Sequence, residues 1–318
     1  KLMEYRRMPQ CVRTALLWVV RGGHEGSSDS SRTTSSAVWR LTSRESSSRF
    51  VCDGVVDNCY KTHSSPTGEA VMITTALTRR FALQYPLVLA PMGGVAGGEL
   101  AAAVSNAGGL GLVGGGYGDT AWLRRELDLV RQLTEKPWGV GLITWAISPG
   151  VLQLTLDYRP HAVMLSFGDP RPHAKSIKDR GAVLICQVQD IESAHLAMQA
   201  GADFIVAQGT EAGGHGSARA TLPLVPAVVD AVAPLPVLAA GGISDGRGVA
   251  AALMLVTEGA LIGTRFYASH QALGAAAAKR EITTRRGGDT LRTQVFDIVR
   301  GYDWPAPYTG RAVRNDFI

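Results

Sequence analysis

Hydrophobic and polar positions follow a repeating order between residues 85 and 264, where short apolar runs alternate with amphipathic stretches. The apolar runs are nearly continuous, which is typical of parallel strands buried on both faces. The amphipathic stretches carry apolar residues at helical spacing, so Leu123, Leu127, Val130 and Leu133 are expected on one helix face. The predicted strands cover residues 85–92, 110–113, 138–144, 162–166, 182–187, 204–206, 236–239 and 260–262.

Capping residues support the helices between these runs. Asp119 or Thr120 can cap one helix, and Ser148 supplies an N-cap before a proline at the first helical position. A helix over residues 190–200 ends before Gly201, a residue suited to the C′ position. Eight short strands that alternate with helices predict an α/β fold, a (β/α)8 TIM barrel, rather than an open sheet.

Residues 1–71 follow no such order and are rich in Ser and Arg. Ser and Thr dominate residues 27–48, a composition that buries too little apolar surface to offset the entropy of ordering. The chain begins with Lys1, and Met72 stands just before the regular pattern. We therefore expect a disordered extension over residues 1–71, outside the functional fold, and a barrel domain over residues 72–318. Our hypothesis for its origin is an upstream start-site artefact.

The formal net charge of +5 does not indicate a nucleic-acid partner. Residues 1–71 hold 10 of the 32 Lys and Arg and 7 of the 27 Asp and Glu, which leaves 22 against 20 for the rest. Such a nearly neutral body lacks the basic surface of a nucleic-acid-binding protein.

The apolar runs are too short to span a membrane. Cys186 is the single cysteine after residue 71, so the sequence predicts a reducing, cytoplasmic location.

The strand over residues 204–206 leads into a loop in which Gly213, Gly214 and Gly216 surround His215. Active sites of α/β barrels lie at the carboxyl ends of the strands, glycine allows close approach to a ligand, and histidine transfers protons near neutral pH. His215 is therefore the candidate catalytic residue. The alternative is a structural histidine bonded to the loop backbone. Glu211 is a possible partner, although an exposed loop carboxylate is the simpler interpretation, and no ligand-spaced cluster predicts a metal site.

Two glycine pairs follow the seventh and eighth predicted strands. Gly241 and Gly242 end one strand, and Gly263 with Thr264 ends the next, 22 residues later. Barrels bind phosphate at these strand ends, through backbone N–H groups and a helix N-terminus, whereas ordinary turn glycines are the simpler alternative. The fingerprint G-x-G-x-x-G over residues 109–114 straddles a strand instead of following one, which excludes a dinucleotide-binding fold.

Other strand ends carry neutral groups, among them Thr144, Gln187, Gln208 and the segment Ala90-Pro-Met92. Amides and backbone groups suit a planar heterocycle with several donors and acceptors. A serine–histidine–acid order and a nucleophile elbow are both missing from the sequence, so hydrolysis is disfavoured.

Five motifs in order resemble the nitronate monooxygenase family, formerly called 2-nitropropane dioxygenases, over residues 79–317. They begin at Pro91, Ala107, Gln208, Ala240 and Gly263. The resemblance implies an FMN-dependent barrel in which His215 lies near the reactive edge of the flavin. The implied FMN-binding residues are Ala90, Pro91, Met92, Thr144, Gln187, Gln208, Gly213, Gly214, Ala240, Gly241, Gly242, Gly263 and Thr264.

The expected activity is oxidation of an alkyl nitronate, or of a nitroalkane, by O₂ to a carbonyl compound and nitrite. The alternatives are an NAD(P)H-dependent flavin reductase of quinones or enoyl thioesters, a flavin-free isomerase or lyase acting on a phosphorylated metabolite, and a non-catalytic relative that only holds a ligand. The chain departs from the family at Val256-Thr257, where we expect a strained corner, and at Ser217. It also stops at Ile318, where many relatives continue, a difference expected to affect stability and lid completeness more than chemistry.

Overall fold

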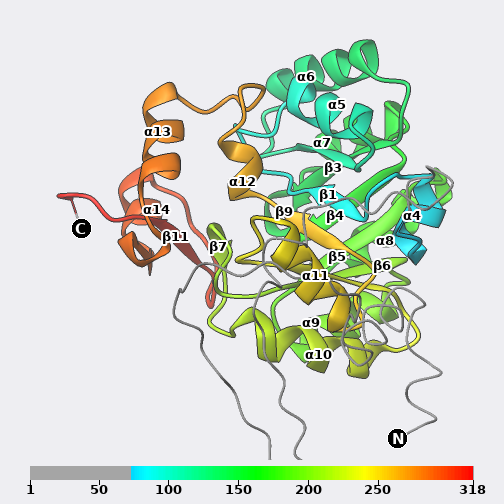
Figure 1. Cartoon of the computed structure of the whole chain (residues 1–318). Helices are drawn as coiled ribbons and strands as arrows, with labels where there is room; N and C mark the ends of the chain where they lie inside the picture. Colours follow the sequence, from blue (N-terminus) through cyan, green and yellow to red (C-terminus); the bar gives the residue numbers. More distant parts are fainter. Residues whose placement is uncertain (1–72, 318) are drawn as a thin grey trace, which may run out of the picture. The chain divides into compact units, whose positions relative to one another are not determined.

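The computed structural model describes residues 73–317, so the predictions made for residues 1–72 lie outside the described part. Its main feature is an eight-stranded parallel sheet in the order β1-β9-β8-β6-β5-β4-β3-β2. The two end strands meet through a parallel bridge between Val88 and Leu110. There the Leu89 amide donates to the Leu110 carbonyl, and the Leu110 amide to the Leu87 carbonyl, both at 2.9 Å. The sheet thereby closes into the predicted barrel (Figure 1).

The strands and helices of the barrel alternate along the chain as the apolar pattern predicted. The strands are β1 (Leu87–Leu89), β2 (Gly111–Gly114), β3 (Trp138–Ile143), β4 (Ala162–Ser166), β5 (Val183–Val188), β6 (Phe204–Gln208), β8 (Val237–Ala240) and β9 (Ala260–Ile262). The helices of the barrel are α4 (Ala76–Phe81), α5 (Gly98–Asn106), α6 (Thr120–Leu133), α7 (Pro149–Asp157), α8 (Arg171–Asp179), α9 (Ile191–Gln199), α10 (Thr221–Val232) and α11 (Gly246–Met254).

Two apolar clusters hold the barrel together. One fills its interior, where Met164, Ile185 and Val206 from neighbouring strands are all buried, and Leu77 and Phe81 of α4 join them. The other lies between the outer face of the strands and the surrounding helices. Each strand therefore buries side chains on both faces, which explains why the strands are nearly continuous apolar runs.

The predicted N-caps of α6 and α7 are confirmed, and α9 has an N-cap, Asp190, that was not predicted. Asp119 and Asp190 accept hydrogen bonds from amides in the first turns of α6 and α9, and Ser148 does so for α7. Leu123, Leu127 and Val130 of the predicted helix face are buried, whereas Leu133, the last residue of α6, is 45% exposed. Helix α10 was not predicted, since its sequence contains Pro226 in the helix interior.

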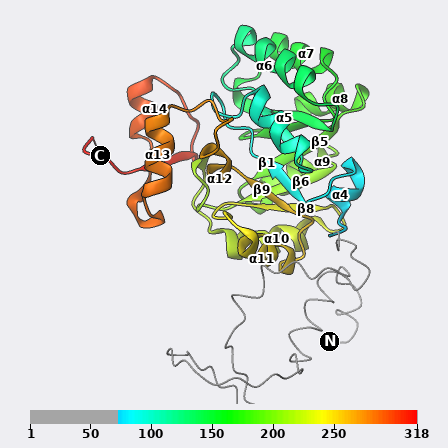
Figure 2. The same ribbon diagram turned by 45° about the horizontal axis from the view of Figure 1, so that its top comes forward.

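A second, smaller sheet lies beside the barrel (Figures 1 and 2). It pairs β7 (Gly214–Gly216), from the glycine loop, with β11 (Thr309–Val313), and β11 with β10 (Thr290–Thr293), all antiparallel. The connecting segments contain α12 (Thr264–Tyr267), α13 (Ala276–Thr284), a 3-10 turn (Gly287–Asp289) and α14 (Val295–Arg300). The sequence predicted a loop at residues 214–216, and the structure shows a short strand there instead.

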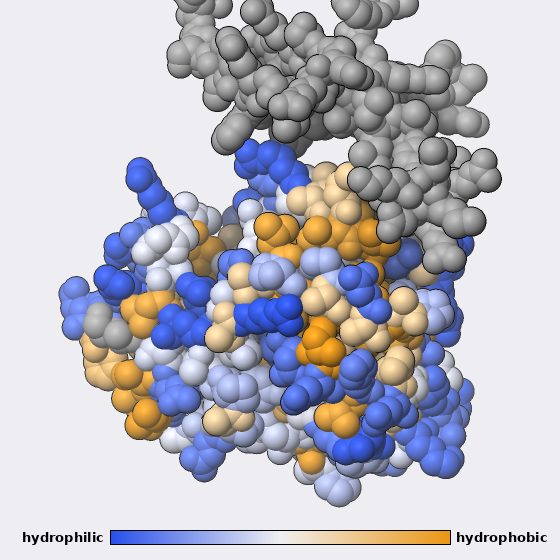
Figure 3. Space-filling view, turned by 90° about the horizontal axis from the view of Figure 1, so that it is seen from below, coloured by the Kyte–Doolittle hydropathy of each residue, from blue (hydrophilic) through white to orange (hydrophobic). Residues whose placement is uncertain are grey.

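Within residues 73–317, every helix is too short or too polar to cross a lipid bilayer. Figure 3 shows hydrophilic residues spread over the face seen from below, with hydrophobic residues gathered in smaller groups among them.

The corner between α11 and β9 is strained, as expected from its sequence. Val256 has a φ of +65°, in the left-handed region that β-branched residues avoid. The next side chain holds this conformation in place, because the buried hydroxyl of Thr257 donates to the carbonyl of Ala252 at 2.8 Å. Val256 itself is 41% exposed, so little packing offsets the strain.

Replacing Val256 by glycine should therefore stabilise the protein. We expect Val256→Gly to raise the free energy of unfolding by about 1 kcal/mol, because glycine occupies the left-handed region without strain. Urea denaturation measures the change. The control is Val249→Gly in the middle of α11, which should lower the stability. A loss of stability in Val256→Gly would show that the corner is not strained.

Candidate active site

The ends of the first and eighth barrel strands lie against each other. The Ala90 amide donates to the Ile262 carbonyl at 2.9 Å. A Cβ atom built on Gly263 would lie 3.4 Å from the Cβ of Ala90 and 3.5 Å from the sulfur of Met92. The structure therefore brings the segment 90–92 and the pair 263–264, far apart in sequence, to one place at the carboxyl end of the barrel.

The glycine loop reaches the same place. A Cβ atom on Gly213 would lie only 2.5 Å from the hydroxyl oxygen of Thr264, and one on Gly242 would lie 3.1 Å from the Cβ of Glu211. Gly241 and Gly242 have φ values of +107° and +74°, which other residues rarely adopt. The three glycine-containing segments predicted to surround a ligand thus meet, and the contact at Gly213 leaves no room for a side chain.

Three buried glutamines connect the fifth and sixth strands to the glycine loop. The side-chain oxygen of Gln208 accepts hydrogen bonds from Gln187 at 3.3 Å and from Gln189 at 2.9 Å. Its amide nitrogen donates to the carbonyl of His215 at 3.1 Å. Gln189 was not predicted from the sequence, although its position two residues after Gln187 places both side chains on one side of the extended chain.

Thr144 is the buried polar residue that lacks a partner. Its hydroxyl, at the end of β3, is the buried side-chain oxygen or nitrogen for which the described residues provide no hydrogen bond. Buried hydroxyl groups are normally hydrogen-bonded, so an unpaired one calls for an explanation. A bound ligand with a polar atom at this strand end would supply the missing partner.

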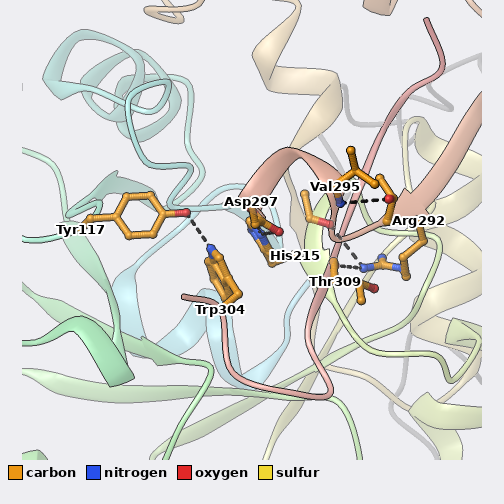
Figure 4. Close-up of polar contacts among 9 residues, drawn as sticks. Tyr117, His215, Arg292, Val295, Asp297, Trp304 and Thr309 are labelled. Carbon is orange, nitrogen blue, oxygen red and sulfur yellow. Dashed lines mark hydrogen bonds and ion pairs between the residues drawn. The ribbon is translucent and has the colours of Figure 1, made fainter. Parts of the chain in front are cut away.

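His215 lies in β7, opposite Gly310 of β11. Its Nε2 atom is 3.0 Å from each carboxylate oxygen of Asp297. The indole of Trp304 stacks on the imidazole, with ring centres 3.5 Å apart and planes inclined by 7°. Figure 4 shows Asp297 at the edge of the ring and Trp304 against its face.

The surroundings of His215 favour its neutral form. Burial lowers the pKa of His215 below its usual value, and the positive charges of Arg292 and Arg300 lower it further. The hydrogen bond to Asp297 and its negative charge act in the opposite direction, without overcoming the effect of burial. At neutral pH the imidazole is therefore uncharged and can accept a proton.

Trp304 belongs to an aromatic cluster and is its member that contacts this histidine. The cluster is formed by Tyr117, Trp145, Phe167, Tyr302, Trp304 and Tyr308. The Trp304 indole N–H donates to the Tyr117 hydroxyl at 2.9 Å, and Tyr117 stacks on Tyr302 with ring centres 4.3 Å apart. Trp304 also meets Phe167 edge to face at 5.0 Å. The cluster joins residues that follow strands β2, β3 and β4 to the segment 302–308. Together these aromatic side chains form an apolar wall, which meets His215 at Trp304.

Arg292 ties the glycine loop to the second sheet. Its guanidinium donates to the carbonyls of Thr210 at 2.9 Å and Ala212 at 3.1 Å, and also to the carbonyl of Thr309. Burial lowers the pKa of Arg292 to about 10, so the group stays charged at neutral pH. Arg311 adds a second bond to the Thr210 carbonyl at 2.9 Å.

Glu211 is not the partner of His215. Its carboxylate accepts hydrogen bonds from the amide of Thr221 at 2.9 Å and from the Thr221 hydroxyl at 2.8 Å. It is an exposed loop carboxylate, which agrees with the simpler of the two interpretations. The actual partner, Asp297, lies 82 residues after His215, and no local sequence pattern joins the two.

The remaining candidate groups are inert or absent. Cys186 is buried in β5, and burial raises the pKa of its thiol to about 12. Such a thiol carries no reactive thiolate at neutral pH. Across residues 73–317, no three His, Cys, Asp or Glu side chains lie close enough together to hold a metal ion.

Comparison with known proteins agrees with this geometry. The family model of nitronate monooxygenase matches residues 74–150 and 144–303. A probable nitronate monooxygenase of Staphylococcus aureus (strain MRSA252) is 33% identical over 274 residues, covering 71% of this chain and 77% of that protein. The chain belongs to the nitronate monooxygenase family. It is therefore an enzyme, a flavin oxidoreductase of the nitronate monooxygenase type.

Solved structures support the same assignment. FabK from Thermotoga maritima superposes with a TM-score of 0.71 and 33% identity, covering 77% of this chain and 76% of that one. Nitroalkane oxidase from Streptomyces ansochromogenes superposes with a TM-score of 0.67 and 30% identity, covering 76% of this chain and 80% of that one.

The role of Arg292 in fixing the glycine loop can be tested directly. We expect Arg292→Ala to increase amide hydrogen exchange in residues 209–216 and 309–313, because the carbonyls of both segments lose a charged donor. Mass spectrometry of exchanged peptides measures the effect. Arg314→Ala, at an exposed arginine just beyond β11, is the control and should leave the exchange unchanged. Equal exchange in Arg292→Ala and the unaltered protein would contradict the role.

Proposed function

We propose that this protein is an FMN-dependent nitronate monooxygenase. Its substrate is an alkyl nitronate or the parent nitroalkane, which it oxidises with O₂ to a carbonyl compound and nitrite. The observation that carries the proposal is the position of His215, a half-buried imidazole whose pKa is lowered, beside the meeting point of the glycine segments. Family membership and the likeness to nitroalkane oxidase support the same reaction.

The described residues fit FMN. The unpaired hydroxyl of Thr144 offers a polar contact for the flavin ring or ribityl chain, and the side-chain amides of Gln187 and Gln208, which are bonded to each other, are the proposed second contact. Gly241, Gly242 and Thr264, at the ends of β8 and β9, form the expected phosphate site. The other proposed FMN contacts are Ala90, Pro91, Met92, Gly213, Gly214, Ala240 and Gly263.

FMN, when bound, supplies the electron transfer and the reaction with O₂ that side chains cannot perform. The protein supplies position and proton transfer. With an anionic nitronate, only the protonated imidazole can donate a hydrogen bond to the nitronate oxygens, because the hydrogen of the neutral ring faces Asp297. With a neutral nitroalkane, the uncharged imidazole removes the proton from the α carbon. The apolar wall formed by the aromatic cluster, as defined above, suits the alkyl part of such a substrate.

A cytoplasmic location is part of the proposal, supported by the single, reduced cysteine in the described barrel.

The alternative activity is an NAD(P)H-dependent flavin reductase of quinones or enoyl thioesters. The enoyl reductase domain of MlnA from Bacillus amyloliquefaciens, 15% identical with a TM-score of 0.63, shares the fold. Anaerobic mixing separates the two, because flavin bleaching by NADH or NADPH without nitronate would favour the reductase.

The first measurement is the visible spectrum of the purified protein, followed by oxygen uptake with ethyl nitronate. We expect bound FMN and nitronate-dependent oxygen consumption. Protein that stays without flavin absorbance after FMN is added would overturn the proposal and favour a flavin-free barrel enzyme. Protein that binds FMN but consumes no oxygen would favour the reductase or a non-catalytic relative.

His215→Ala should keep FMN but lose turnover of a neutral nitroalkane by about 10²- to 10⁴-fold, the usual contribution of a general base. His195→Ala, at a histidine in α9, is the matched control and should retain activity. Steady-state oxygen uptake and the flavin content are measured on the same samples. Unchanged turnover in His215→Ala would remove the histidine from the mechanism.

The activity towards a neutral nitroalkane should depend on pH through His215. Only the uncharged imidazole accepts a proton, and burial lowers its pKa below the ordinary value of 6.5. We therefore expect kcat/KM to be constant above that value and to fall as the pH drops below the lowered pKa. The profile of kcat/KM against pH tests this, and an inflection above pH 6.5 would contradict the lowered pKa.

A further inference from the structure

The carboxylate of Asp297 is buried and has one hydrogen-bonding partner. Its side chain is 8% exposed, and among residues 73–317 its oxygens bond to His215 Nε2 alone, at 3.0 Å each. A buried carboxylate without a donor is strongly unfavourable. Nε2 must therefore carry a hydrogen whenever Asp297 is ionised.

The other ring nitrogen of His215 is left free for chemistry. The described residues give Nδ1 no hydrogen bond. A neutral imidazole holds one hydrogen, so a hydrogen on Nε2 leaves Nδ1 with a lone pair. The tautomer of a histidine is set in this way by the bond that its second nitrogen makes.

Trp304 restricts the ring from a second direction. Its indole covers one face of the imidazole at 3.5 Å, and its N–H is itself bonded to Tyr117. The His215 carbonyl is held by Gln208. The ring is thus fixed along its edge by Asp297, across its face by Trp304 and through its backbone by the glycine-loop strand (Figure 4).

We propose that Asp297 is a positioning residue for His215: its carboxylate keeps the hydrogen on Nε2, so that Nδ1 accepts the proton from the substrate. The C–H bond at the α carbon of a nitroalkane breaks, the proton moves to Nδ1, and the electron pair stays on the resulting nitronate. Asp297 does not touch the substrate. The role in proton abstraction rests on the proposed function, whereas the tautomer does not.

The charged groups that act on His215 come from two elements. Asp297 and Arg300 belong to α14, and Arg292 belongs to β10. Asp297 opposes the lowering of the pKa of His215 that burial and the two arginines cause. Removal of the negative charge should therefore lower the pKa of His215 further.

The first test is nuclear magnetic resonance of the full chain labelled with ¹⁵N-histidine. The chain contains seven histidines, and the spectrum of His215→Gln identifies the signals of His215. We expect the hydrogen on Nε2 in the unaltered protein. A hydrogen on Nδ1 at neutral pH would overturn the proposal without any variant of Asp297.

Asp297→Asn keeps the size of the side chain and removes its charge. We expect a larger share of the tautomer with hydrogen on Nδ1 and a lower titration midpoint for His215. The control is Asp303→Asn, which removes an exposed carboxylate six residues away and should change neither quantity. A tautomer and a midpoint that are the same in Asp297→Asn and the unaltered protein would show that Asp297 only ties α14 to the loop.

Activity provides an independent measurement. A preformed nitronate has already lost its α proton, whereas a nitroalkane has not. The ratio of nitroethane to ethyl nitronate turnover should fall by about tenfold or more in Asp297→Asn, and stay constant in Asp303→Asn. Equal losses with both substrates would argue against positioning. If the unaltered protein oxidises neither compound, the proposed function fails, and the tautomer measurement still decides the role of Asp297.

Discussion

The site depends on the antiparallel pairing of β7 with β11. In this pairing Gly214, His215 and Gly216 lie opposite Arg311, Gly310 and Thr309, respectively. A strand of three residues that includes two glycines has little stability of its own. Its position is therefore imposed by β11, and by the guanidinium of Arg292, which binds carbonyls on both sides of the junction. The barrel places the glycine loop at the carboxyl end of its strands, but the segment that follows the barrel fixes the conformation of His215.

The same segment sets the electrostatics of the site. Burial lowers the pKa of His215, and the two arginines act in the same direction. The Asp297 carboxylate restores part of the basicity. A general base is most effective when its pKa lies near the working pH. The negative charge therefore has a chemical use beyond joining two elements, and it is placed where water screens it little.

The barrel could be predicted from the sequence because each strand is buried on both faces and each helix on one, which produces a pattern visible locally. Features that depend on distant partners could not. Helix α10 was not predicted because its sequence contains Pro226. The free-energy cost of a proline inside the helix is offset by the apolar packing of Leu224 and Val228. His215 and the glycine pairs were found from their places at strand ends. Asp297 and Trp304 were missed because their sequence neighbours contain no sign that they would meet His215.

Residues 295–308 couple two properties of the site that are separate in many enzymes. They contain Asp297, which fixes the edge of the imidazole, and Trp304, which covers its face and belongs to the wall of the substrate region. Trp304 cannot leave the histidine without also breaking its bond to Tyr117 and its contact with Phe167. A movement of this segment that widened access to the site would thus change the contacts that orient the base. In the proposed mechanism, access and proton transfer would both depend on this one short stretch of chain, so substitutions in it should rarely affect only one of them.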